Sequence, residues 1–101
     1  MDKSVSELVI ALCADFERRR CAIRDKSMSQ RVLMEYKFLN LRILEATMEI
    51  VGVRDALLFI DDIGARRGYA KSQIDGLSEP IYKRKKAEVK LYIAKKLALI
   101  D

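Results

Sequence analysis

The sequence predicts an all-helical protein, in which a long N-terminal antiparallel helical hairpin precedes a short helix and a C-terminal helix pair of the helix-turn-helix kind. Three observations predict this class. Apolar residues recur at steps of three and four along most of the chain, the chain has four glycines and one proline, and 101 residues suffice for one hydrophobic core. We expect a single domain over 1–101, with the hairpin over 1–52 and the helix-turn-helix-like part over 53–101.

The first helix is predicted to begin at Ser4, because Glu7 three residues later completes a capping box. Arg19 interrupts the apolar seam of this helix. Because Arg18, Arg19 and Arg20 point in three directions around a helix, they indicate a solvated or partner-paired helix end rather than a nucleic-acid motif. The seam consists of Val5, Val9, Leu12, Phe16 and Ile23.

A second, longer helix is predicted over 28–51, after a polar turn in which Ser27 and Gln30 form another capping box. It carries two apolar stripes, which indicate two partners: the first helix, and either the C-terminal part of the chain or a second subunit. The stripes are Tyr36, Leu39, Ile43, Ala46 and Ile50, and beside them Phe38, Leu41, Leu44, Met48 and Val51.

Gly52 is expected to end that helix in a left-handed conformation, and a short helix is predicted over 53–63 before Gly64. Asp61 and Asp62 indicate no metal site, because adjacent helix positions diverge and no further ligands lie nearby. The residues expected to face inward are Ala56, Leu57, Ile60 and Ile63.

The segment "ARRGYAKSQIDGLSEP" contains two glycines and the single proline, so it predicts turns with at most one short helix, around 69–75. Ser78 suits an N-cap and Pro80 is tolerated in a first helical turn, so the last helix is predicted over 79–100. Its inward stripe comprises Tyr82, Val89, Ile93, Leu97 and Ile100.

Composition argues against catalysis and against any cofactor. The chain lacks histidine, which is the usual general base and the commonest metal ligand, and it has no glycine-rich phosphate loop. Cys13 and Cys21 are too far apart on one helix for a disulfide, so we expect reduced thiols, with a redox switch between subunits as the alternative. No stretch is apolar enough to span a membrane and the opening "MDKS" is unlike a secretory signal, which predicts a cytoplasmic protein.

Positive charge is concentrated at the C-terminal end of the chain. Residues 66–101 contain ten of the twenty cations and four of the fifteen anions, a net charge of +6, whereas the whole chain carries +5. Lys83, Arg84, Lys85 and Lys86 encircle the start of the last helix. Burying unpaired charges is costly, so this end must meet water or a polyanion such as nucleic acid.

A short helix, a turn at Gly76 and a longer basic helix form the layout of a helix-turn-helix DNA reader. In this interpretation Leu77 and Tyr82 anchor the recognition helix, and Ser72 allows close approach of the helices. A solvated, lysine-rich helix end is the alternative interpretation. The cations expected to contact phosphates or base edges are Lys83, Arg84 and Lys86, with phosphate contacts added by Arg66, Arg67 and Lys71.

The stretch "GLSEPIYKRKKAEVKLYIAKKLALI" resembles the end of a sigma-factor region 4 helix-turn-helix, and more closely small phage and mobile-element transcription regulators of the ArpU type. The resemblance covers about the last 35 residues. It implies DNA binding through residues that match Ser78, Lys83, Arg84 and Lys86.

These observations together predict a cytoplasmic, non-enzymatic, DNA-binding transcription regulator of phage origin. Its partners are expected to be duplex DNA and a second copy bound through the N-terminal helices, with RNA polymerase as a further candidate. The alternative is an oligomerisation or protein-interaction module that uses the stripes of 28–51 and has no nucleic-acid role. An enzyme using Glu45 and Glu49 is a third hypothesis, although such i, i+4 pairs usually share an exposed helix face.

Overall fold

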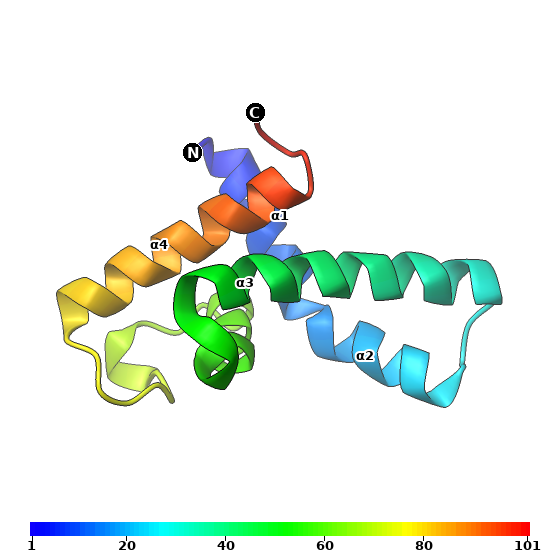
Figure 1. Ribbon diagram of the computed structural model, residues 1–101, viewed down its shortest axis with the longest axis horizontal. Coiled ribbons are helices and arrows are strands. Elements are labelled where there is room, and N and C mark those ends of the chain that lie inside the picture. The colour runs from blue at the N-terminus through cyan, green and yellow to red at the C-terminus, as the bar shows by residue number, and fades with distance from the viewer.

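The computed structural model describes all residues from Met1 to Asp101 and consists of helices without strands (Figure 1). The all-helical prediction is therefore confirmed. The elements are α1 (Lys3–Ala14), α2 (Phe16–Asp25), α3 (Gln30–Gly64), the 3₁₀ turn η1 (Tyr69–Lys71) and α4 (Glu79–Lys96).

Helices α1 and α2 form one N-terminal helix that bends at Asp15. The predicted capping box of Ser4 and Glu7 is wrong. Asp2 caps α1 instead, its carboxylate accepting a hydrogen bond from the Ser4 amide at 2.7 Å. The helix begins earlier than predicted because Asp2 is a good capping residue two positions before Ser4. Glu7 instead forms an ion pair with Arg66, in the loop after α3.

Helix α2 and the N-terminal half of α3 run side by side in opposite directions (Figure 1). This hairpin is shorter than the one predicted over 1–52, because the N-terminal helix bends at Asp15. Lys26 ends α2 in the left-handed conformation, with φ 52°. Ser29 then caps α3 by accepting a hydrogen bond from the Val32 amide, so the expected cap at Ser27 lay too early.

Gly52 breaks α3 into two helical segments. Its φ of 81° and ψ of 175° lie outside the helical region and are open essentially to glycine alone; the positive φ agrees with the prediction, whereas this ψ is not that of the left-handed conformation. After the kink the chain turns sharply away from the axis of 30–51 (Figure 1).

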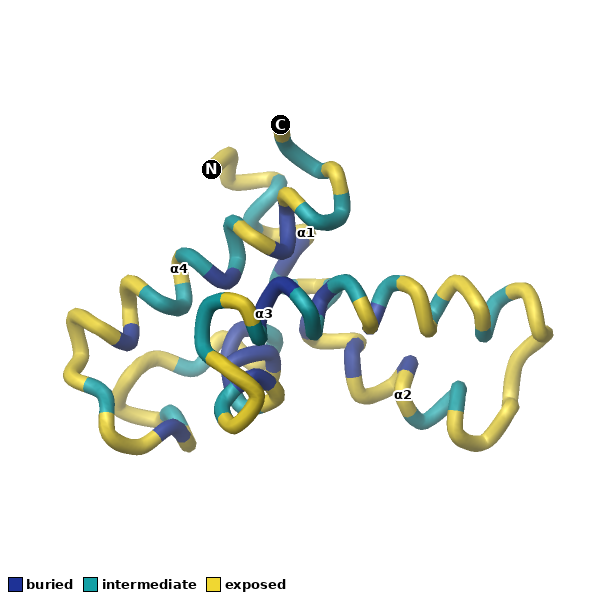
Figure 2. The backbone as a smooth tube through the Cα atoms, viewed as in Figure 1, coloured by how far each residue is buried: buried dark blue, intermediate teal, exposed yellow.

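The core lies where α1, both segments of α3, and α4 meet (Figure 2). Beyond the kink, Phe59 is fully buried while Leu57 is half exposed, so the inward position assigned to Leu57 was wrong. Gly64 comes so close to α1 that a Cβ there would lie 2.6 Å from the Ala14 nitrogen. The main cluster contains Val9, Cys13, Phe16, Ile43, Ala46, Ile60, Ile63, Val89, Ile93 and Ala94.

The C-terminal region departs furthest from prediction. The helix expected over 69–75 is the single turn η1, and the whole connection over 65–78 is longer than the roughly three- or four-residue turn of a helix-turn-helix. Helix α4 stops at Lys96 rather than at residue 100, because Ala98 adopts φ 57° and the Leu99 amide bonds back to the Ala94 carbonyl.

The molecule measures 43 × 29 × 20 Å, and the α2–α3 hairpin forms one end of its long axis (Figure 1). No helix combines the length and the apolar sequence needed to cross a bilayer.

Candidate nucleic-acid interface

The first turns of α4 present two exposed cations, Lys83 and Arg84. Lys83 pairs with Glu79 at 3.0 Å and Arg84 approaches Glu88 at 3.7 Å, and the side chains of both cations are about two-thirds exposed. Exposed i, i+4 pairs of this kind contribute little free energy. Both cations can therefore exchange their carboxylate partner for another anion at small cost.

Lys86 lies differently from its neighbours. Its Nζ donates a 2.5 Å hydrogen bond to the Arg67 carbonyl and sits 5.8 Å from the centre of the Tyr82 ring. Partial burial, and next the nearby charge of Lys90, lower the pKa of Lys86. None of the four adjoining cations is buried in the core, and Lys86 ties α4 to the preceding loop.

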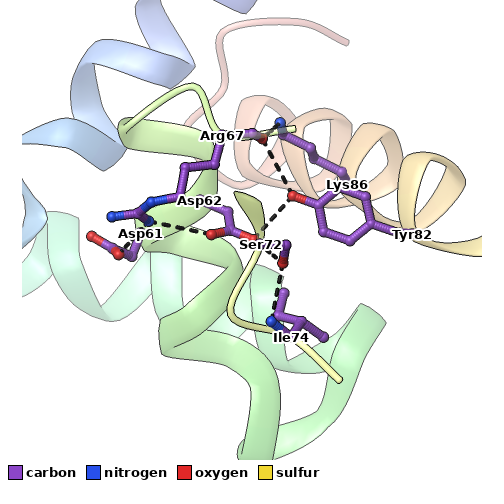
Figure 3. Close-up of polar contacts among 7 residues, drawn as sticks. All are labelled: Asp61, Asp62, Arg67, Ser72, Ile74, Tyr82 and Lys86. Carbon is purple, nitrogen blue, oxygen red and sulfur yellow. Dashed lines mark hydrogen bonds and ion pairs between the residues drawn. The ribbon is translucent and has the colours of Figure 1, made fainter. Parts of the chain in front are cut away.

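Beneath this basic turn lies a buried polar cluster, the Asp62 network, made of Asp62, Arg67, Ser72, Tyr82 and Lys86 (Figure 3). The Asp62 side chain is inaccessible to solvent. Its carboxylate accepts hydrogen bonds from the Ser72 hydroxyl at 2.5 Å, from the Tyr82 hydroxyl at 3.0 Å and from the Arg67 guanidinium at 3.2 Å. The network joins the end of α3, the loop over 65–78 and α4.

Tyr82 is the member of the network that belongs to α4. Its ring is buried and stacks on Phe59 with the ring centres 5.6 Å apart. Burial, followed by the hydrogen bond to Asp62, raises the pKa of Tyr82 to about 12. Tyr82 thus anchors the N-terminal half of α4 against α3, as predicted for the recognition helix.

Of the remaining predicted site residues, some are exposed without a side-chain partner and others form ion pairs or hydrogen bonds within the chain. Lys71 on η1 is exposed, without an ion pair, and Ser78 is exposed at the N-cap of α4, where its hydroxyl makes no capping bond. Arg66 pairs with Glu7 of α1. Arg67 bonds to Asp61 and Asp62, and these hydrogen bonds raise its pKa.

The predicted set is therefore only partly free to meet a ligand. Lys71, Ser78, Lys83 and Arg84 are exposed, and so is Arg66, whose pair with Glu7 lies at the surface. Arg67 and Lys86 are half-buried and hold the loop in place. Ser72, expected merely to be small, is instead a hydrogen-bond donor to Asp62.

Sequence reasoning missed two buried charged residues, Asp62 and Arg19. From the sequence we expect no metal role for Asp62 but do not predict its burial, although its place beside Phe59 and Ile63 on the inward face is a signal of burial. Arg19 was expected to be solvated or partner-paired, but it is 2% exposed and donates within its own chain to the Asn40 side chain at 2.7 Å and to the Leu12 carbonyl at 2.5 Å. The interruption of the apolar seam was the sign that Arg19 faces the core.

Acidic side chains do not gather into a group that could hold a metal ion. No group of three or more potential metal-ligating side chains is close enough to hold an ion. Glu45 and Glu49 both face Lys96, at 3.7 and 3.2 Å, so this i, i+4 pair joins α3 to α4.

Comparison of the chain with protein-family models, with curated proteins and with solved structures found no match.

Proposed function

We propose that the protein is a DNA-binding transcription regulator that docks the N-terminal half of α4 on duplex DNA. The observation that carries the proposal is the exposure of Lys83 and Arg84 on a helix whose position is fixed by the Asp62 network. Cations on a rigid element meet phosphates at a fixed spacing, which favours binding in a defined orientation.

The charge of the C-terminal region supports this proposal. Half of the ten cations in 66–101 form no ion pair with a carboxylate: Lys71, Lys85, Lys86, Lys90 and Lys95. This excess of positive charge attracts a polyanion over a distance of about one Debye length. The connection over 65–78 is too long for a compact helix-turn-helix. We therefore propose that a single basic helix, held in place by this loop, contacts the DNA.

The test is fluorescence anisotropy with a labelled generic DNA duplex, measured at several salt concentrations. We expect salt-dependent binding, and we expect Lys83→Glu with Arg84→Glu to abolish it at moderate salt, while any residual binding at low salt has a log–log salt slope reduced by about two. Lys86 is left unchanged, because its bond to the Arg67 carbonyl makes it part of the fold.

A matched control reverses two exposed cations outside α4. Lys3→Glu with Lys26→Glu changes the net charge equally, and neither lysine makes a side-chain hydrogen bond or ion pair. This control variant should lose only the part of the DNA affinity that comes from the net charge of the protein. If both double variants bind alike, or if the native protein does not bind DNA at low salt, the proposal is wrong.

A second candidate function is assembly without a nucleic-acid role, and the exposed apolar residues of α3 favour it. Met34, Phe38 and Leu41 are each more than half exposed. In this alternative the lysines of α4 keep the protein in solution. A contact with RNA polymerase stays a prediction.

A further inference from the structure

The outer face of the N-terminal half of α3 has no partner within the chain. None of the residues from Gln30 to Leu39 is buried, although α2 packs along the other side of the helix (Figure 2). Met34 is 62% exposed, Phe38 58% and Leu41 54%. Three large apolar side chains on adjacent turns form a continuous exposed strip.

This strip has the spacing of a coiled-coil seam. Arg31, Met34, Phe38, Leu41 and Glu45 follow one another at steps of three, four, three and four, so they share a face of α3 about 80° wide. Such a seam fits another helix over several turns at a small crossing angle. We call these five residues the α3 seam.

The charges at the two ends of the α3 seam have opposite signs. Arg31 lies at the N-terminal end and is almost fully exposed. Glu45, and Glu49 one turn beyond it, lie at the C-terminal end, where both share Lys96 of α4 as an ion-pair partner and stay partly exposed. The apolar residues lie between them. Over 30–51 the three cations Arg31, Lys37 and Arg42 balance the three anions Glu35, Glu45 and Glu49, in a chain that carries +5 overall.

We propose that a second copy of this chain covers the α3 seam, in antiparallel orientation about a two-fold axis between Phe38 and Leu41. Phe38 of each copy then packs against Leu41 of the other, and Arg31 of each copy lies beside Glu45 and Glu49 of the other. Parallel pairing would instead place arginine against arginine and glutamate against glutamate. The seam is thus self-complementary in one orientation alone.

This inference stands apart from DNA binding, because Lys83 and Arg84, the cations proposed to meet DNA, make no contact with the seam. In the proposed dimer the two α2–α3 hairpins form a four-helix arrangement, which gives the projecting hairpin the second layer that an isolated helix pair lacks.

Sedimentation equilibrium without DNA tests the proposal. We expect the native chain to show a monomer–dimer equilibrium and Phe38→Glu to raise its dissociation constant by at least about tenfold. The matched control is Val53→Glu, since Val53 is 78% exposed and lies outside the seam. A native chain that stays monomeric across the concentration range, or a Phe38→Glu variant that dimerises like the Val53→Glu control, overturns the proposal.

Charge reversal tests the orientation. Arg31→Glu replaces the attraction to Glu45 and Glu49 of the other copy by repulsion, so we expect the dissociation constant of the dimer to rise by about three- to tenfold. The control Lys3→Glu makes the same charge change outside the seam. Arg31 is bonded only loosely to Glu35, at 3.6 Å, so its reversal should leave the fold intact by circular dichroism. Equal dissociation constants for the two variants would rule out antiparallel pairing.

Discussion

Asp62 and Arg19 are charged side chains that are at least 98% buried, and each is surrounded by hydrogen-bond partners. No buried side-chain polar atom in the molecule lacks a partner. Removing one member of such a set leaves the others unpaired in a medium of low dielectric constant. The two residues therefore stabilise the fold by forming hydrogen bonds to buried polar groups that would otherwise have no partner.

Replacing Asp62 by alanine should lower the free energy of unfolding by about 3 kcal/mol, because Ser72, Tyr82 and Arg67 lose a shared acceptor. Urea denaturation followed by circular dichroism measures the change. Asp61→Ala is the matched control, since Asp61 bonds to the same Arg67 but is exposed, and it should leave stability nearly unchanged. Equal effects of the two substitutions would contradict the structural role of the Asp62 network.

Two buried protonated groups predict a loss of stability at alkaline pH. Burial raises the pKa of Cys13 from 9.0 to about 12, and burial with the Asp62 hydrogen bond raises that of Tyr82 from 10.0 to about 12. Between pH 9 and 12 the folded state binds more protons than the unfolded chain, so the free energy of unfolding should fall as pH rises.

Urea denaturation at a series of pH values above 9 checks this expectation. Tyr82→Phe removes one of the two groups, so its stability should depend less steeply on pH than that of the native chain. A free energy of unfolding that stays constant over this interval in the native protein would refute the assignment.

At the scale of the elements, the kink at Gly52 decides how α3 serves two parts of the molecule. The helix forms one wall of the hairpin before the kink and carries Phe59, Asp62 and Ile63 into the body after it. A residue with a Cβ would be strained at φ 81°, although nothing lies within 4 Å of the position.

Gly52→Ala should therefore reduce the free energy of unfolding by about 1 to 3 kcal/mol through backbone strain alone. Differential scanning calorimetry of the variant measures the effect. Gly68→Ala is the control, because Gly68 also has open space around it but has a negative φ of −89°. If both variants melt at the same temperature, the kink does not require glycine.

The hairpin, the break at Gly52 and the inward stripe of α4 could be predicted because each depends on local periodicity or on a single glycine. The Asp62 network could not, because its members come from positions 62 to 86 and meet only through the irregular loop over 65–78. The same holds for Arg19, whose acceptor Asn40 is 21 positions away. Exposure of Lys83 and Arg84 followed from charge alone, whereas the inward turn of Lys86 depended on where the Arg67 carbonyl lies.

For the molecule as a whole, the two proposed surfaces lie on different helices. The α3 seam belongs to the projecting hairpin, while Lys83 and Arg84 stand on α4, beyond the core (Figure 1). A two-fold dimer through the seam would contain two copies of α4 related by the same axis. Half-sites related by inverted symmetry would then match the symmetry of the protein.

The near contact between Gly64 and Ala14 limits how the sequence can change over evolution. The backbones of α1 and α3 approach so closely there that hydrogen is the largest side chain that fits. Apolar residues elsewhere in the core can drift in size if their neighbours compensate, but this crossing cannot. A distant descendant that keeps the same helix crossing should retain glycine at this point even after most of its other residues have diverged.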